Sequence, residues 1–298
     1  MSSFSKAGHL VSLLNKGDFK ILKVFASSLK NRQFLNLTTL SQYANLSQGL
    51  IEHHLERLVK FGLISKSNIG YTLLVTGLDM YVLKILSNKN IITALGPQIG
   101  IGKEAEVYLA RDLLNQDRIL KMFRLGRSSF KQIKRKRDVG TGINSWLLLN
   151  IETAKKEYDI LTYLKDSSSS FPTPLYRSFH CIVMEAIYGN RLSDIGNLSD
   201  PELVLDKIIN NIAIAYRRGF INGDLNEYNI LVNDDNIFIL DWPQAVIVDT
   251  VNADIVLTRD VKNILKFFSK KFNVEKDTHE IINKIKRNAS QELHEKKS

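Results

Sequence analysis

Two short runs of strand-forming residues flank a polar turn, and three side chains that carry oxygen frame this hairpin. The runs are residues 229–232 and 237–240, and the turn between them is Asn-Asp-Asp-Asn. This alternation of apolar runs and turn formers predicts two antiparallel strands. Asp224 and Asn229 stand before or at the start of the first run, and Asp241 follows the second. Because a hairpin brings the chain back to where it started, the three side chains are expected to converge.

The spacing from Asp224 to Asn229, followed by a later aspartate, is the pattern D-x-x-x-x-N…D of a phosphoryl-transfer centre. In that pattern the first aspartate is the catalytic base, and the asparagine and second aspartate hold magnesium. An ordinary polar turn between two strands is the alternative, since Asp, Asn and Gly are the commonest turn formers. The choice between the two depends on the residues upstream.

The composition is that of a globular protein, with 298 residues, 44% of them hydrophobic and 24% charged. This length is sufficient for two domains. No apolar run is long enough to span a membrane, and the first residues lack a signal-peptide stretch, so we expect a cytoplasmic protein with no membrane partner. The single cysteine, Cys181, cannot form an internal disulfide and is expected in a buried strand.

The formal net charge of +10 favours a polyanionic partner, such as nucleic acid or a ribonucleoprotein. Part of the excess is crowded into one stretch, whose like charges would repel unless they were solvated or paired with phosphate. Its basic residues are Arg124, Arg127, Lys131, Lys134, Arg135, Lys136 and Arg137. A phosphate-binding segment and a solvated loop both remain open for it.

The first ninety residues predict three helices, two strands and a final helix. Asp18 is expected to cap the first helix and Ser47 the third, and residues 63–65 and 71–75 to form the strands. Helix, turn, helix and β-wing is the order of a winged-helix domain.

The second helix of the winged-helix pair is the one that often reads DNA. Here it carries Glu52 and Glu56, which would repel phosphates. The sequence therefore argues against sequence-specific DNA as a partner, and favours docking to RNA, to protein or to the domain that follows. A plain packing module is the alternative.

From Ile91 onward the pattern changes to short strands. Gly100 and Gly102 form a glycine turn before an alternating strand, and Lys121 is the one inward lysine of the next strand. Glycines let the backbone approach nucleotide phosphates, and a nearby lysine can neutralise them. Taken alone, the glycine turn is better explained as a plain β-turn, because Ala105 replaces the third glycine of G-x-G-x-x-G.

Two further segments suit a bilobal kinase. Residues 151–164 have helical periodicity, and Glu157 there is expected to pair with Lys121, although a surface position beside two lysines would also explain it. Residues 181–187 predict a strand that resembles a hinge between lobes, where an adenine could bind.

Several motifs then occur together. They are Gly100-Ile101-Gly102-Lys103-Glu104, Leu125-Gly126-Arg127-Ser128-Ser129-Phe130, Lys136-Arg137-Asp138, Ser145-Trp146-Leu147, Gly223-Asp224-Leu225-Asn226-Glu227-Tyr228-Asn229 and Asp241-Trp242-Pro243-Gln244. In combination they closely resemble the RIO family of atypical serine/threonine kinases, over nearly the whole chain. With the winged helix in front, the similarity is to the second RIO subfamily.

The resemblance implies an α+β chain in which a winged helix (residues 1–90) precedes a trimmed bilobal kinase-like domain. The N-lobe would cover residues 91–187, the C-lobe 188–275 and a charged tail, expected to fray, 276–298. It also implies ATP and Mg²⁺ as cofactors, with Mn²⁺ as an alternative metal. Family members act in small-subunit maturation, so the implied partners are the small ribosomal subunit precursor and its rRNA.

The resemblance also implies roles for individual residues. Asp224 would be the catalytic base, Asn229 and Asp241 would hold the metal, and Glu157 would pair with the lysine. Asp241 could in addition accept the phosphoryl group as an aspartyl-phosphate. The implied ATP-binding residues are Gly100, Gly102, Lys103, Glu104, Val107, Lys121, Met184, Glu185 and Ile187.

Two positions depart from the family pattern. Asn222 stands where the catalytic loop usually has histidine, and Ala105 stands where the glycine loop usually has a phosphate-contacting serine. Asn222 could still brace the loop through backbone hydrogen bonds, whereas Ala105 supplies no hydroxyl. The Ala105 departure therefore concerns ATP binding, whereas Asp224, Asn229 and Asp241 all match the family pattern.

The segment after Asp241 contains no A-P-E motif and is too short for the peptide-binding half of an ordinary kinase. We therefore expect slow ATP hydrolysis or autophosphorylation that works as a switch, rather than phosphorylation of many peptides. The alternative is a winged-helix nucleic-acid-binding module with a catalytically weak, ATP-binding pseudokinase domain. A transcription regulator is a third hypothesis.

Overall fold

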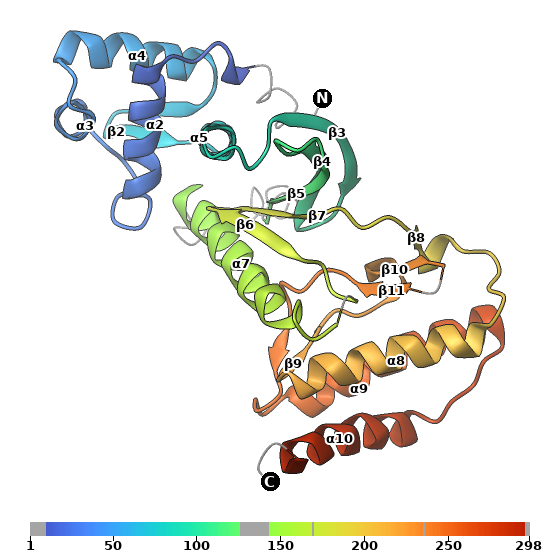
Figure 1. Ribbon diagram of the computed structural model, residues 1–298. Coiled ribbons are helices and arrows are strands. Elements are labelled where there is room, and N and C mark those ends of the chain that lie inside the picture. The colour runs from blue at the N-terminus through green and yellow to red at the C-terminus, as the bar shows by residue number, and fades with distance from the viewer. Residues whose placement is uncertain (1–9, 126–142, 169, 235, 296–298) are drawn as a thin grey trace. The chain divides into compact units, whose positions relative to one another are not determined.

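The computed structural model describes residues 10–125, 143–168, 170–234 and 236–295 (Figure 1). The chain forms two compact units. The first comprises Met1–Ala154 and Tyr176–Val183, and the second comprises Lys155–Leu175 and Met184–Ser298. Most of the predicted basic stretch, residues 126–142, lies outside the described residues, together with the family-like motifs within it.

The first unit begins with a small helical domain that carries a two-stranded wing (Figure 1). Its elements are α2 (Lys16–Ser28), α3 (Leu37–Ala44), α4 (Gln48–Lys60), β1 (Ile64–Ser67), β2 (Gly70–Leu73) and α5 (Val75–Asn88). This is the winged-helix order that the sequence predicts. The core between the helices is apolar, with Ile21, Leu22, Ile51, Leu55 and Leu58 fully buried.

The start of α2 differs from the prediction. Asn15, not Asp18, is the N-cap, and its side chain accepts hydrogen bonds from the N–H groups of Gly17 and Asp18. Asp18 completes a capping box by accepting the N–H of Asn15 at 2.9 Å, and its other oxygen lies 2.8 Å from Nδ1 of His54. Asp18 therefore stabilises the start of α2 from position N3 of the capping box, and its contact with His54 connects α2 to α4.

A five-stranded sheet follows in the order β3-β4-β5-β7-β6. Its strands are β3 (Ala94–Ile101), β4 (Ala105–Arg111), β5 (Asp117–Phe123), β6 (Pro174–Ser178) and β7 (Cys181–Glu185), and the long helix α7 (Ile143–Leu164) lies between β5 and β6 in the chain. Cys181 is fully buried in β7, as predicted, and burial raises the pKa of its thiol.

The winged helix and this sheet share one core. Buried residues of α2, α4 and α5 form a continuous cluster with Tyr108, Leu120 and Val183 of the sheet. A buried polar network crosses the same boundary. Asp79 of α5 lies 2.9 Å from Arg124 and 2.8 Å from Nε2 of His180, while Arg124 lies 3.3 Å from Glu106.

Arg124 therefore does not belong to a solvated or phosphate-facing basic stretch, as its sequence context predicted. Only 5% of its surface is exposed, and two carboxylates compensate its charge. Burial opposes ionisation of Asp79, but the charge of Arg124 and the hydrogen bond from His180 outweigh it and lower the pKa of Asp79.

The second unit is a group of helices with two small sheets (Figure 1). Its elements are β8 (Asn190–Arg191), η1 (Leu192–Asp194), α8 (Pro201–Arg217), β9 (Phe220–Ile221), η2 (Glu227–Asn229), β10 (Ile230–Asn233), β11 (Asn236–Ile239), β12 (Val246–Ile247), α9 (Ala253–Phe272) and α10 (Thr278–Glu295). β10 and β11 pair antiparallel, which confirms the predicted hairpin. Asn211 of α8 donates to the Ile237 carbonyl and ties the hairpin to the helix.

The C-terminal segment that was expected to fray forms α10. Ile281, Ile282 and Ile285 are buried, because their i, i+1, i+4 spacing gives the helix an apolar side that packs on α8 and α9. Among the helices within the described part of the chain, none is both long and apolar enough to cross a membrane.

Candidate active site

The loop between β9 and η2 carries Asp224, and its backbone is fixed from several directions. Gly223 has φ +84°, a conformation that favours glycine, and a Cβ there would lie 2.3 Å from the Gln244 carbonyl oxygen. The N–H of Gly223 donates to Asp260 at 2.7 Å. The loop is thus held between the segment after β11 and helix α9, with the Asp224 side chain exposed.

Asn222 braces this loop, which confirms the role suggested for it. Its Nδ2 donates to the carbonyls of Asp241 at 2.8 Å and Leu240 at 3.3 Å, and its Oδ1 accepts the N–H of Asp224 at 3.2 Å. One buried amide therefore connects the backbone of the two predicted catalytic aspartates. Although Asn222 replaces the usual histidine, its hydrogen bonds still support the loop.

The side chain of Asn229 is oriented by the same loop. Its Nδ2 donates to the backbone carbonyl of Asp224 at 2.9 Å. A carbonyl can only accept, so the NH₂ group must face it and the other atom of the amide, Oδ1, is the one that can reach a cation. Asn229 is therefore connected to Asp224 in a way that suits the predicted metal ligand.

Asp241 has φ +55°, a left-handed conformation that is uncommon for a residue other than glycine. The next residue anchors it. Trp242 is fully buried, donates from Nε1 to the Ile239 carbonyl at 3.0 Å, and packs edge-to-face on Phe171. The Asp241 side chain is exposed beside this anchor, so the strained backbone directs a carboxylate to the surface.

Glu157 of α7 contributes to the same anchor. Its Oε1 accepts the N–H of Trp242 at 3.3 Å, and only 1% of the residue is exposed, so the alternative of a surface glutamate is wrong. Lys121, its predicted partner, belongs to the other unit, and the pairing of the two stays a prediction.

Asp260 is a site residue that the sequence reasoning missed, since its helix was expected only to pack. It is 1% exposed and accepts the Gly223 N–H. Burial raises the pKa of Asp260, and the hydrogen bond from Gly223 opposes this. A signal was present: Asp260 falls at helical spacing from the buried Leu257 and Ile264, where an apolar residue is usual.

The predicted phosphate-binding residues lie in the first unit. The glycine turn joins β3 to β4, and the N–H of Gly102 donates to the Ala105 carbonyl at 2.8 Å. Gly100 pairs with Val107, and Val107 pairs with Lys121, so the turn leads directly to the strand of the lysine. Lys103 is exposed and Glu104 partly so, and the Glu104 carbonyl accepts the N–H of Arg124.

Lys121 is 5% exposed, and its Nζ lies 5.2 Å from the ring centroid of Phe123. A lysine this buried is retained where its charge has a use, because desolvation of an ammonium is costly. The prediction that the Lys121 side chain points inward from its strand is thus confirmed.

The predicted hinge residues lie in the second unit. Met184 is buried, while Glu185 and Ile187 line a cavity of about 340 Å³ together with Phe171, Thr173 and Tyr188. The N–H of Glu185 already donates to the Thr173 carbonyl at 3.0 Å. Of its two backbone groups, only the carbonyl could therefore bond an adenine.

The donor set suits magnesium. Mg²⁺ takes oxygen ligands, and proteins supply it with one or two carboxylates or amides while water and substrate phosphates complete the shell. The Oδ1 of Asn229 and the carboxylate of Asp241 are ligands of this kind. Within the described residues no group of three or more His, Cys, Asp and Glu is placed to hold a metal.

Comparison with known proteins identifies the family. The RIO domain model matches residues 106–281, which is more than half of the chain. The model of the Rio2 N-terminal domain matches residues 11–89. The chain belongs to the RIO family. The two matches confirm the order that the sequence predicts for this RIO chain, an N-terminal domain followed by a kinase-like domain.

Curated relatives place the RIO chain in the Rio2 branch. It is 36% identical to the serine/threonine-protein kinase rio2 of Dictyostelium discoideum, over 87% of this chain and 51% of that protein. It is 32% identical to the RIO2 kinase of Caenorhabditis elegans, over 93% and 54% respectively. It therefore spans about half the length of these two relatives. The RIO-type kinase Rio2 of Methanocaldococcus jannaschii is 32% identical over 86% of this chain and 98% of its own.

A solved structure has the same fold as the RIO chain. It is the Rio2 kinase of Chaetomium thermophilum in an ADP/Mg²⁺-phosphoaspartate complex, with TM-score 0.82 and 27% identity, covering 90% of this chain and 84% of that one. Nucleotide and magnesium are thus present in a kinase of this fold.

Proposed function

We propose that the chain is a cytoplasmic ATP/Mg²⁺-dependent phosphotransferase of the serine/threonine kinase type, whose turnover acts as a switch in small ribosomal subunit maturation. The observation that carries the chemistry is the Asn222 amide, which connects the backbones of Asp224 and Asp241. The phosphoaspartate complex of the Chaetomium relative supports an aspartate as phosphoryl acceptor.

Each site residue has a defined task in this proposal. A carboxylate oxygen of Asp241 forms a bond to the γ-phosphorus of ATP, the bond from that phosphorus to the β–γ bridging oxygen breaks, and ADP leaves with the electron pair. Water then attacks the phosphorus, Asp224 accepts a proton from it, and phosphate leaves as the Asp241 carboxylate is restored. Magnesium, held by Asn229 and Asp241, would neutralise phosphate charge.

The short connection after Asp241 favours a switch over phosphorylation of many peptides. β12 pairs with β9 at Val246 and Ile247, and α9 begins at Ala253. This turn leaves no room for the long activation segment that a protein kinase uses to hold a peptide.

ATP turnover tests the enzymatic part. We expect Asp224→Ala and Asp241→Ala each to lower the rate by about 100-fold or more, because a positioned acid or base contributes on the order of 100- to 10,000-fold. Asp249→Ala, which removes an exposed carboxylate outside the site, is the matched control and should retain the rate. With γ-radiolabelled ATP, wild type should take up label that hydroxylamine releases, and Asp241→Ala should not. Equal rates in all four proteins would leave an ATP-binding module without catalysis.

Co-sedimentation with small-subunit precursors tests the partner. We expect the chain to sediment with the precursors, to respond to ATP, and to be released as salt rises, because phosphate contacts are lost with salt. Failure to bind at every salt concentration would remove the ribosomal part of the proposal and leave the ATP chemistry intact.

A further inference from the structure

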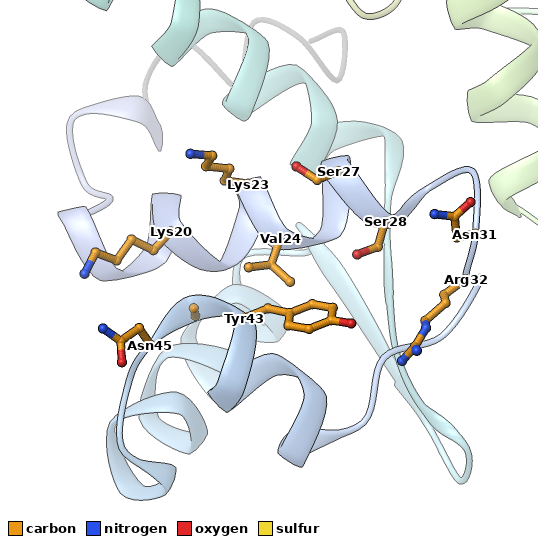
Figure 2. A pocket seen from close by; sticks show the side chains of 10 residues that line it. Lys20, Lys23, Val24, Ser27, Ser28, Asn31, Arg32, Tyr43 and Asn45 are labelled. Carbon is orange, nitrogen blue, oxygen red and sulfur yellow. The ribbon is translucent and has the colours of Figure 1, made fainter.

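A groove lies on the winged-helix domain, and none of the predicted phosphoryl-transfer residues is among those that line it. It has a volume of about 720 Å³ and is formed by α2, the loop after it and the end of α3 (Figure 2). Volumes of about 300 to 1,000 Å³ are typical of sites that hold small ligands or parts of larger ones. We call it the α2–α3 groove.

The charged side chains of the α2–α3 groove are all basic. Lys20, Lys23 and Arg32 line it, and no aspartate or glutamate is among the described residues that do so. Lys20 and Lys23 are exposed and stand three residues apart, so they lie on neighbouring parts of one helix face. The single carboxylate of α2, Asp18, is buried and bonded to His54, and it does not offset them. Such a site favours an anion.

An aromatic ring lies in the same groove. Tyr43 at the end of α3 is 58% exposed, although its neighbour Ala44 and the facing Val24 are buried. Figure 2 shows its ring extending between α2 and α3, on the side of Val24. Exposed aromatic rings beside lysines are the combination by which proteins hold single strands, since the ring stacks on a base while the cations contact the backbone.

Amide groups complete the lining. The side chains of Asn31 and Asn45 each offer a hydrogen-bond donor and an acceptor. Asn45 is the C-cap of α3, where its backbone is left-handed with φ +49°. Such groups can bond base edges or a ribose hydroxyl. In a duplex, by contrast, base faces are stacked and inaccessible to Tyr43.

The surface of α4, the other candidate on this domain, is less suitable for binding nucleic acid. On α4, the helix that winged-helix proteins often place on nucleic acid, Glu52 and Glu56 are both exposed and four residues apart. Arg57 of α4 is engaged with Asp18 and the Leu13 carbonyl. Carboxylates on one face of α4 would repel phosphates.

We infer that the α2–α3 groove binds a single-stranded nucleic acid segment, with Lys20 and Lys23 on its phosphates and a base stacked on Tyr43. The inference rests on the part of the proposed function that gives this chain an RNA partner, and it specifies where and in what form the RNA is held. It is independent of the phosphoryl-transfer residues.

The test uses the full chain and a fluorescein-labelled single-stranded RNA of about ten nucleotides, with anisotropy measured at several salt concentrations. The double variant Lys20→Ala/Lys23→Ala should bind about tenfold more weakly, and its salt slope should fall by roughly 1.4, at about 0.7 for each single-strand phosphate contact. Lys60→Ala/Lys66→Ala removes the same charge from α4 and the wing and should bind within about twofold of wild type.

Variants of Tyr43 distinguish the contribution of base stacking to RNA binding from that of charge. Tyr43→Ala should weaken binding by about tenfold with an unchanged salt slope, and Tyr43→Phe should retain binding, because stacking depends on the ring. The same sequence as single-stranded DNA shows whether the ribose hydroxyl is read, and as a duplex it should bind more weakly. The inference is overturned if the two lysine pairs have equal effects, if Tyr43→Ala has none, or if the duplex binds as tightly as the strand.

ATP turnover is measured on the same proteins. The groove variants should keep the wild-type rate, since the groove is outside the catalytic residues. RNA binding lost with turnover intact supports the groove, whereas absent turnover in wild type with normal RNA binding would contradict only the phosphoryl-transfer proposal.

Discussion

Residues with unusual backbone conformations fix the predicted catalytic loop of this RIO chain. Gly223 and Asp241 both have positive φ, and the loop keeps them so through the Gly223 N–H bond to Asp260 and the buried ring of Trp242. A left-handed conformation at a residue other than glycine costs on the order of 1 kcal/mol, so it persists only where neighbours compensate. Asp260 is therefore expected to matter for activity, although it contacts the backbone of Gly223 and is not itself one of the predicted catalytic residues.

The Asp260 side chain can be tested by a matched pair of variants. Asp260→Ala leaves the partly buried Gly223 N–H without its acceptor, which should lower the free energy of unfolding by about 1 kcal/mol and ATP turnover by about tenfold through misplacement of Asp224. Asp260→Asn keeps an acceptor and removes a charge that burial disfavours, so it should stay near wild type in both. Denaturant unfolding and ATP turnover measure the two effects. Equal losses in both variants would show that charge, not acceptance of the N–H, is what counts.

At the scale of elements, periodic patterns predicted the hairpin, the winged helix and the inward Lys121, because each depends on neighbours close in sequence. Contacts between distant residues were not predictable in this way. Asp260 lies 37 residues from Gly223, and Glu157 lies 85 from Trp242. The pattern D-x-x-x-x-N selects Asp224 and Asn229 as candidates, but it does not predict side chains such as Asp260 that hold their loop, since these come from elements placed by tertiary packing.

Element boundaries were missed for local reasons. Asn15 and Asp18 are both good N-caps, and only the geometry of a capping box distinguishes them. In α10, abundant charge concealed the three isoleucines that bury one side of the helix. The position of Arg124 was also missed. The run of basic residues around it suggested a solvent-exposed side chain, whereas Asp79, 45 residues earlier, provides a buried partner.

At the scale of the whole molecule, the network around Asp79 gives the first unit a pH response. Burial lowers the pKa of His180 below its ordinary 6.5, although the hydrogen bond to Asp79 opposes this. The folded state therefore holds His180 neutral while the unfolded chain binds a proton, so this stability is present above about pH 6.5 and declines as pH falls below it. The lowered pKa of Asp79 adds a second decline below 3.8.

Thermal melting across pH 7.5 to 5 measures this response. Wild type should lose stability through the window, whereas His180→Gln, which keeps an N–H donor for Asp79 and cannot titrate, should have a flatter profile. Parallel profiles for the two proteins would assign the pH dependence to other groups.

The same network has a mechanical consequence. The chain passes between its two units three times, within α7 and in β6 and β7. Within the first unit, Asp79 and Arg124 fasten the winged helix to the sheet that carries Lys121. The winged helix is therefore not attached by a flexible linker, but is packed against the sheet that carries Lys121, the predicted phosphate-binding lysine. If the proposed function is correct, a displacement of Lys121 during nucleotide turnover would be transmitted through Arg124 and Asp79 to the winged helix, and so to the nucleic acid that we propose it binds.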